Sequence, residues 1–88
     1  MKIREGFILQ SVAESHVVVP VGEATTALNG VIMLNESGVL LWNLLKEDSD
    51  PGKLPRELMN EYGISADKAA HDTDVFLDSL RKIGCLEE

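Results

Sequence analysis

The apolar pattern of the chain changes once, at Asn35, and this change constrains the fold more than any other feature. Before it, the segments 7–12, 16–19 and 28–34 are short and apolar, and 16–19 contains a dense β-branched run, which favours strands. After it, apolar residues recur at helical spacing. Strands followed by helices predict an α+β domain, in which a three-stranded antiparallel sheet precedes three helices.

The length of the chain limits it to one small core. Eighty-eight residues predict a single domain over residues 1–88. No apolar run exceeds four residues, so the chain has no membrane-spanning segment, and no apolar segment follows the basic residues of the N-terminus to make a secretory signal. A single cysteine, Cys85, excludes an internal disulfide and a multi-cysteine zinc site. We expect a cytoplasmic protein without a membrane partner.

The first half predicts a hairpin and a third strand. Segments 7–12 and 16–19 pair through a turn at 13–15, and Pro20-Val21-Gly22 ends the second strand because proline cannot donate to a central ladder. A polar loop follows at 23–26. The third strand spans 28–34, with Asn29-Gly30 as a tight turn or bulge.

The second half predicts three helices. Asn35 caps the first, whose apolar residues cover almost every side and place it at the centre of the core. Gly38 weakens a helix by up to ~1 kcal/mol, so we interpret it as the point where this helix rests on the sheet. The second helix spans about 54–62 and carries Pro55 in its first turn, and Gly63 ends it.

The third helix begins after Ser65 and stops at Gly84, and Cys85-Leu86 then folds back, with the last two glutamates in solvent. Its apolar face is predicted to comprise Ala66, Ala69, Ala70, Thr73, Phe76, Leu77, Leu80 and Ile83. The predicted core comprises Leu34, Leu41, Trp42, Leu45, Phe76, Leu77 and Leu80.

No set of residues predicts catalysis. His16 is interpreted as the outward half of a strand alternation, His71 as a solvated residue of the third helix, and Cys85 as a small hydrophobe. The acidic residues of the third helix predict a solvated face rather than a metal site: Asp67, Asp72, Asp74 and Asp78. We therefore expect no enzyme, no catalytic residue, no metal and no cofactor.

Charge argues against nucleic acid as a partner. The net charge is −7, of which the residues from Asn35 onward carry −6. The order of elements suits a winged helix-turn-helix, but a DNA reader of that class needs a basic face on its last helix. Here the middle of that helix reads Asp72-Thr73-Asp74.

The central motif resembles a known family. Leu34-Asn35-Glu36-Ser37-Gly38, followed by Leu41-Trp42 and Leu44-Leu45, is similar to the signature of the pyrroloquinoline-quinone biosynthesis protein D (PqqD-like) family. The resemblance extends over nearly the whole chain, through Gly6-Phe7-Ile8-Leu9, residues 17–22, Glu61-Tyr62, Asp72, Phe76-Leu77, Leu80 and Gly84-Cys85-Leu86. Pro55 and Thr73 depart from the usual helix-favouring residue and valine of the family.

This resemblance implies a non-catalytic peptide-binding chaperone. Such domains capture the leader of a ribosomally made precursor peptide and present it to a modifying enzyme, often a radical-SAM protein. The leader adds as a strand to the third strand and lies beside the third helix. The implied peptide-binding residues are Asn29, Val31, Ile32, Met33, Val75, Ser79 and Lys82.

The strand-addition mechanism predicts that proline at Val31 and at Ile32 acts oppositely, because successive residues of an edge strand point their backbone groups inward and outward in turn. The sequence leaves open which of the two faces outward. Two other functions also remain open: a winged-helix regulator acting through DNA or protein contacts, and a structural subunit without a peptide groove.

Overall fold

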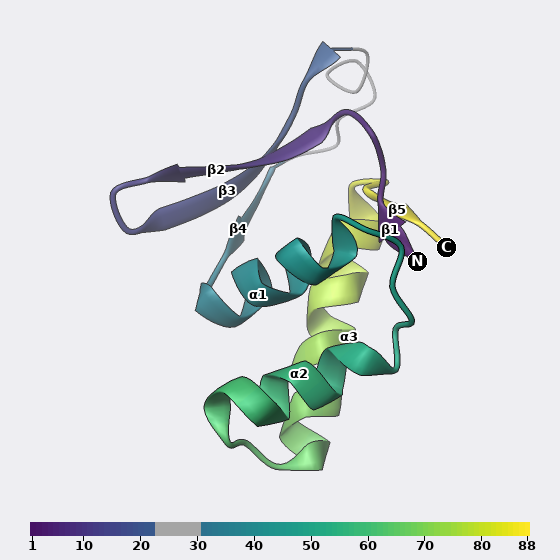
Figure 1. Ribbon diagram of the computed structural model, residues 1–88. Helices are drawn as coiled ribbons and strands as arrows, with labels where there is room; N and C mark the ends of the chain where they lie inside the picture. Colours follow the sequence, from purple (N-terminus) through teal and green to yellow (C-terminus); the bar gives the residue numbers. More distant parts are fainter. Residues whose placement is uncertain (23–30) are drawn as a thin grey trace.

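The computed structural model describes residues 1–22 and 31–88 (Figure 1). The described strands and helices follow in the order β1 Lys2–Ile3, β2 Phe7–Val12, β3 Ser15–Pro20, β4 Ile32–Leu34, α1 Glu36–Leu45, α2 Lys53–Tyr62, α3 Ala66–Lys82 and β5 Leu86–Glu87. Strands β2, β3 and β4 form a three-stranded antiparallel sheet in that spatial order. In Figure 1, α1 lies between this sheet and α2. The predicted α+β fold, with its sheet followed by three helices, is confirmed.

The hairpin of β2 and β3 closes more tightly than predicted. Val12 pairs with Ser15, so the turn consists of Ala13 and Glu14, and Ala13 adopts a left-handed φ of 55°. Pro20 is the last residue of β3 and lies opposite Phe7. The second strand therefore extends one residue beyond each end of the predicted 16–19.

The register determines which backbone groups of β4 face outward. Opposite residues of an antiparallel pair alternate between exchanging two hydrogen bonds and exchanging none. The Val21 N–H donates to the Gly6 carbonyl over 2.7 Å, so the odd-numbered residues of β3 exchange bonds with β2. The even-numbered residues of β3 therefore point their backbone groups at β4.

Strand β4 receives those bonds at two of its three residues. Ile32 lies opposite Val18 and Leu34 lies opposite His16, so both point their N–H and C=O at β3. Met33, between them, points its N–H and C=O away from β3. They face the edge of the sheet where β4 has no further partner among residues 1–22 and 31–88, and we call this the open edge.

Of the predicted strand 28–34, the structure describes residues 31–34, and β4 covers Ile32–Leu34 of these. Val31 is exposed and precedes the strand, and residues 28–30, with the predicted Asn29-Gly30 turn or bulge, lie outside the described residues. Along β3, the even-numbered residues donate their backbone N–H groups to β4, and the next such position after Val18 is Pro20. Proline has no N–H, so Pro20 cannot donate a backbone hydrogen bond at that position.

The two ends of the chain meet in a second, two-stranded sheet that the sequence did not predict. Lys2 pairs with Glu87 and Ile3 with Leu86. Figure 1 shows the two termini side by side. Both C-terminal glutamates are exposed, as predicted, but each is held: Glu87 Oε2 lies 3.6 Å from Lys2 Nζ, and the Arg81 guanidinium donates to Glu88 over 2.7 Å.

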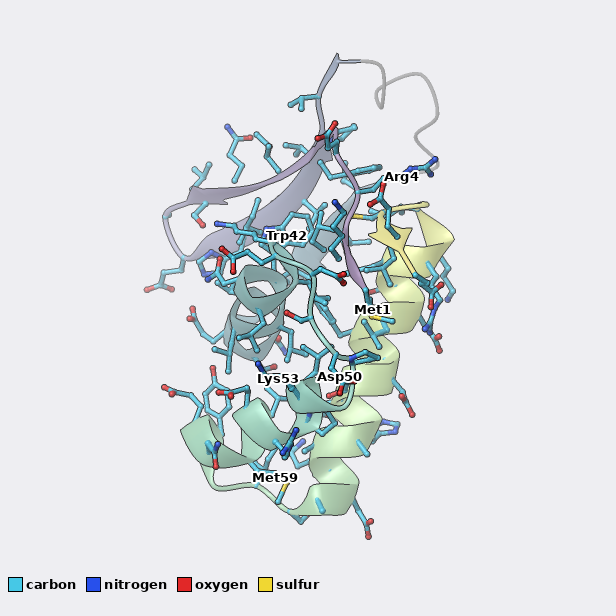
Figure 2. The ribbon with its side chains drawn as sticks, turned by 45° about the vertical axis from the view of Figure 1, so that its right-hand side comes forward. Met1, Arg4, Trp42, Asp50, Lys53 and Met59 are labelled. Atoms are coloured by element: carbon cyan, nitrogen blue, oxygen red, sulfur yellow. The ribbon has the colours of Figure 1, made fainter. Side chains whose placement is uncertain are left out.

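All seven residues of the predicted core are buried. Trp42 is only 1% exposed and lies directly beneath the sheet (Figure 2). Sheet, helices and C-terminus also contribute buried residues: Val18, Leu54, Leu58, Ala69, Thr73, Ile83 and Cys85. Ala66 and Ala70 are exposed, so the predicted apolar face of the third helix was two residues too wide.

The helix ends follow the predicted capping residues. The Gly38 N–H donates to Asn35 Oδ1 over 2.9 Å, and the Lys68 N–H donates to Ser65 Oγ over 3.2 Å. Gly63 and Gly84 take left-handed φ values of 63° and 70° where α2 and α3 end. In Figure 2, Asp50 and Lys53 lie together at the start of α2, where the Lys53 N–H donates to the Asp50 carbonyl over 2.9 Å.

Gly38 allows α1 to approach β4 closely. Leu34 is the last residue of β4, and a Cβ atom at position 38 would lie 3.2 Å from the Leu34 Cβ atom. This close approach agrees with the interpretation of Gly38 as the point where the first helix rests on the sheet. Among the described residues, no helix is long and apolar enough to cross a membrane.

Candidate functional site

A groove of about 440 Å³ runs between the edge strand β4 and helix α3. Its apolar walls come from three elements: Met33 and Leu34 of β4, Leu41 of α1, and Val75 and Phe76 of α3. Met33 and Val75 are 69% and 56% exposed, whereas Leu41 and Phe76 belong to the core. The groove therefore brings accessible apolar side chains to the open edge of the sheet.

The polar side chains of the groove are largely satisfied by one another. Asn35 Oδ1 accepts hydrogen bonds from the Gly38 N–H and from Ser37 Oγ, each 2.9 Å long. Lys68 Nζ lies 3.2 Å from Asp72 Oδ2, one turn further along α3. With these groups paired, the groove offers a ligand apolar contact, the outward backbone of Met33 and the exposed imidazole of His71.

The predicted peptide-binding residues lie in different surroundings in the structure, and only some of them line the groove. Met33 and Val75 both line the groove. Val31 is 55% exposed just before β4, and Ile32 is half-buried, with its backbone turned to β3. Asn29 lies outside the described residues.

Ser79 and Lys82, also predicted from the resemblance, do not line the groove. Ser79 Oγ donates to the Phe76 carbonyl over 2.7 Å, and Lys82 is exposed in the last turn of α3. Both lie one or two turns beyond Val75, toward the C-terminal end of the helix.

Sequence reasoning missed the groove residues at the N-terminal side of Val75: Lys68, His71 and Asp72. They precede Val75 by seven, four and three residues, which places them on the same side of α3. Counting back from Val75 at helical spacing would have identified them from the sequence. His71 is exposed, as expected, but it also lines the groove.

His16 is not the outward-facing residue that the strand alternation predicted. Its side chain is 18% exposed and lies opposite Leu34, on the face of the sheet that covers the core. Its Nδ1 lies 2.6 Å from Ser11 Oγ, and its Nε2 lies 3.1 Å from Glu36 Oε1. The imidazole therefore links the hairpin to the first residue of α1.

The outer face of the sheet is also apolar. Ile8, Val12 and Met33 are 45%, 66% and 69% exposed, and the register places all three on the face opposite the core. Since Met33 also borders the groove, the outer face and the groove meet at the open edge of β4. A strand added at this edge would have side chains on both surfaces.

The described residues include no group of three or more His, Cys, Asp or Glu side chains that could hold a metal ion. The thiol of Cys85 is buried, and this burial raises its pKa to about 12. Because the thiolate is the nucleophilic form, Cys85 is inert at neutral pH. The accessible chemistry of the site is that of an apolar groove beside a strand edge.

The structure is similar to one solved with a peptide. No curated protein sequence matches the chain. A solved structure titled "TbiB1 in Complex with the TbiA(beta) Leader Peptide" superimposes with a TM-score of 0.72 over 100% of both chains, at 19% sequence identity. At this identity the likeness establishes the fold.

The sequence match is more specific than the structural one. Residues 9–86 match the family described as Coenzyme PQQ synthesis protein D (PqqD). This match covers the signature motif, the edge strand and all three helices, and neither comparison supports the winged-helix regulator. The chain belongs to the PqqD family.

Proposed function

We propose that this PqqD-family chain is a non-catalytic peptide-binding domain. It captures the leader of a ribosomally made precursor peptide by strand addition and presents it to a modifying enzyme. The observation that carries this proposal is the open edge of β4, which lies beside an apolar groove. Family membership and the leader peptide named in the TbiB1 structure support it.

Strand addition uses backbone groups that the domain leaves available. Among the described strands, β3 is central and pairs on both sides, whereas β4 pairs with β3 alone. The leader would pair with the outward N–H and C=O of Met33. Main-chain pairing of this kind provides affinity, and the side-chain pockets provide selectivity.

The alternation of an added strand assigns its side chains. Leader residues opposite Ile32 and Leu34 would point into the groove, toward Val75 and Phe76. The residue opposite Met33 would extend the apolar outer face. Covering the exposed parts of Met33 and Val75 contributes on the order of 1–2 kcal/mol each.

The modifying enzyme supplies the chemistry in this proposal, and we assign it to the radical-SAM class on the family resemblance. The net charge of −7 disfavours nucleic acid as a partner. The buried Cys85, with its raised pKa, offers no accessible nucleophile. Co-purification of the domain with an enzyme that carries an iron–sulfur cluster would support this assignment, and a partner without such a cluster would overturn it.

Calorimetric titration tests leader binding directly. The ligand is a synthetic peptide that covers the leader of a short precursor peptide, chosen from the reading frames near the gene for this chain. Val75→Asp places a charge in the groove at an exposed position and should weaken binding about tenfold or more.

Ala70→Asp is the matched control, because it adds the same charge to an exposed position of α3 that does not line the groove. This variant should bind the leader like the wild type. Equal affinities for the two variants would refute the groove as the binding site, and no binding by the wild type would refute the proposed function.

A further inference from the structure

A second hollow continues the groove beyond the end of β4. It measures about 420 Å³ and lies between the start of α1 and the connection from α2 to α3. Its apolar side chains are Tyr62 and Ile64. Tyr62 is 44% exposed, so the hollow offers an accessible aromatic surface.

The hollow and the groove share part of their lining. Asn35 and Ser37 at the start of α1, and the ion-paired Lys68 and Asp72 on α3, border both. These four residues form a common rim. A chain that lies in the groove therefore crosses into the hollow without leaving the surface.

The segment that holds Tyr62 and Ile64 is fixed at both ends. The Gly63 N–H donates to the Met59 carbonyl over 2.8 Å and ends α2. Ser65 Oγ accepts from the Lys68 N–H over 3.2 Å and begins α3. The hollow is thus formed before any ligand arrives, which lowers the entropic cost of binding.

The hollow begins where β4 ends, because the three residues after Leu34 line it: Asn35, Glu36 and Ser37. After Leu34 the protein chain turns away into α1 at Asn35. A peptide paired with β4 would continue straight on and cover roughly 7 Å in two residues. Only alternate residues of an extended peptide face the helices, and the residues between them face the outer side of the sheet.

We infer that the peptide carries two apolar anchors, one opposite Leu34 in the groove and one in the hollow against Tyr62 and Ile64. If the first anchor is residue i of the peptide, the second is residue i+2 or i+4. This inference rests on the proposed function and specifies its substrate class. The even spacing follows from the alternation of the strand, and the shared rim makes both anchors part of one peptide. A second copy of the domain is a poor occupant, because each copy carries a net charge of −7.

A peptide-display selection tests the inference with ligands other than the leader itself. The immobilised domain selects from random peptides on the order of twelve residues long. At ~3.3 Å per residue, an extended peptide of this length spans the groove and the hollow. Wild type is compared with Tyr62→Ser and Ile64→Ser, which remove the apolar surface of the hollow. Glu61→Ser is the control, because Glu61 is an exposed neighbour outside both linings.

We expect the wild type and Glu61→Ser to enrich peptides with two apolar positions at even spacing. Tyr62→Ser and Ile64→Ser should retain only one anchor and bind the two-anchor peptides about tenfold more weakly or worse. Circular dichroism melts establish that each variant is folded, and Tyr62→Ser changes an exposed residue. Val75→Asp should lose the other anchor instead.

The inference would be overturned if the selected peptides carried a single apolar anchor or two anchors at odd spacing. It would also be overturned if they bound the folded Tyr62→Ser and Ile64→Ser variants as tightly as the wild type. The proposed function would still stand in each case. Failure of the wild type to enrich any peptide would overturn the proposed function itself, and the inference with it.

Discussion

Proline substitutions at two adjacent residues of β4 should separate folding from peptide binding. Ile32 directs its N–H to β3, where it lies opposite the fully buried Val18, whereas Met33 directs its N–H to the open edge. Proline removes the N–H at either position. Ile32→Pro should therefore destabilise the domain, and Met33→Pro should spare the fold and weaken leader binding. By the same alternation, Val31→Pro should behave like Met33→Pro.

The magnitudes follow from the groups that lose their partners. Ile32→Pro leaves a buried carbonyl of β3 unsatisfied, which costs about 1–3 kcal/mol, and removes a half-buried side chain worth on the order of 1 kcal/mol. A domain of 88 residues has a free energy of unfolding of roughly 4–13 kcal/mol in total. The Tm should fall on the order of 10–30 °C. Met33→Pro breaks no bond of the ladder, so its Tm should stay within a few degrees of the wild type.

Circular dichroism melts and calorimetric titration with the leader, performed on both variants, check this prediction. Met33→Pro should bind the leader about tenfold more weakly or worse, because a carbonyl of the peptide loses its donor. An Ile32→Pro variant that melts like the wild type would show that the register is wrong. A folded Met33→Pro variant with wild-type affinity would show that the leader does not pair with this edge.

Three further predictions concern the core and the surface. Trp42→Ala should lower the free energy of unfolding in urea by about 3–5 kcal/mol, because Trp42 is 1% exposed, and a loss below ~1 kcal/mol would contradict its place in the core. Cys85, with a pKa raised to about 12 by burial, should resist a thiol reagent at pH 8 until the protein is unfolded, and rapid labelling of the folded domain would contradict its burial. In a gel shift at physiological salt, duplex DNA should not bind, because α3 offers Lys68, Arg81 and Lys82 against four aspartates, and salt-sensitive binding tighter than about 10⁻⁶ M would revive the regulator.

The features that the sequence predicted correctly have local causes. Asn35 and Ser65 cap their helices with side chains that reach N–H groups three residues away, and Gly63 and Gly84 end helices through their own φ values. The buried residues of α1 and α3 repeat at helical spacing. Such signals lie within a few residues of the structure they determine.

The features that the sequence did not predict depend on residues far apart in the chain. The pairing of β1 with β5 joins two short segments from opposite ends. The register of β4 against β3, which turns the backbone of Met33 outward, depends on residues of another strand. His16 is held by Glu36, twenty residues away. Strand alternation alone has no information about such partners.

The candidate site was predictable to a similar extent. Met33 and Val75 were predicted from the resemblance and line the groove. Asp72 was interpreted as part of the solvated face of the third helix, because its place on the rim depends on how α1 packs against α3. The second hollow depends on three elements at once, so no single stretch of sequence indicated it.

Amide hydrogen exchange at β4 tests the central claim most directly. The isotope-labelled domain is measured by NMR, free and saturated with the leader peptide. In the free domain, the Met33 N–H should exchange rapidly, and the N–H groups of Ile32 and Leu34 should be protected by β3. Binding should slow exchange at Met33 selectively. A saturated complex in which Met33 still exchanges as rapidly as in the free domain would contradict strand addition at this edge.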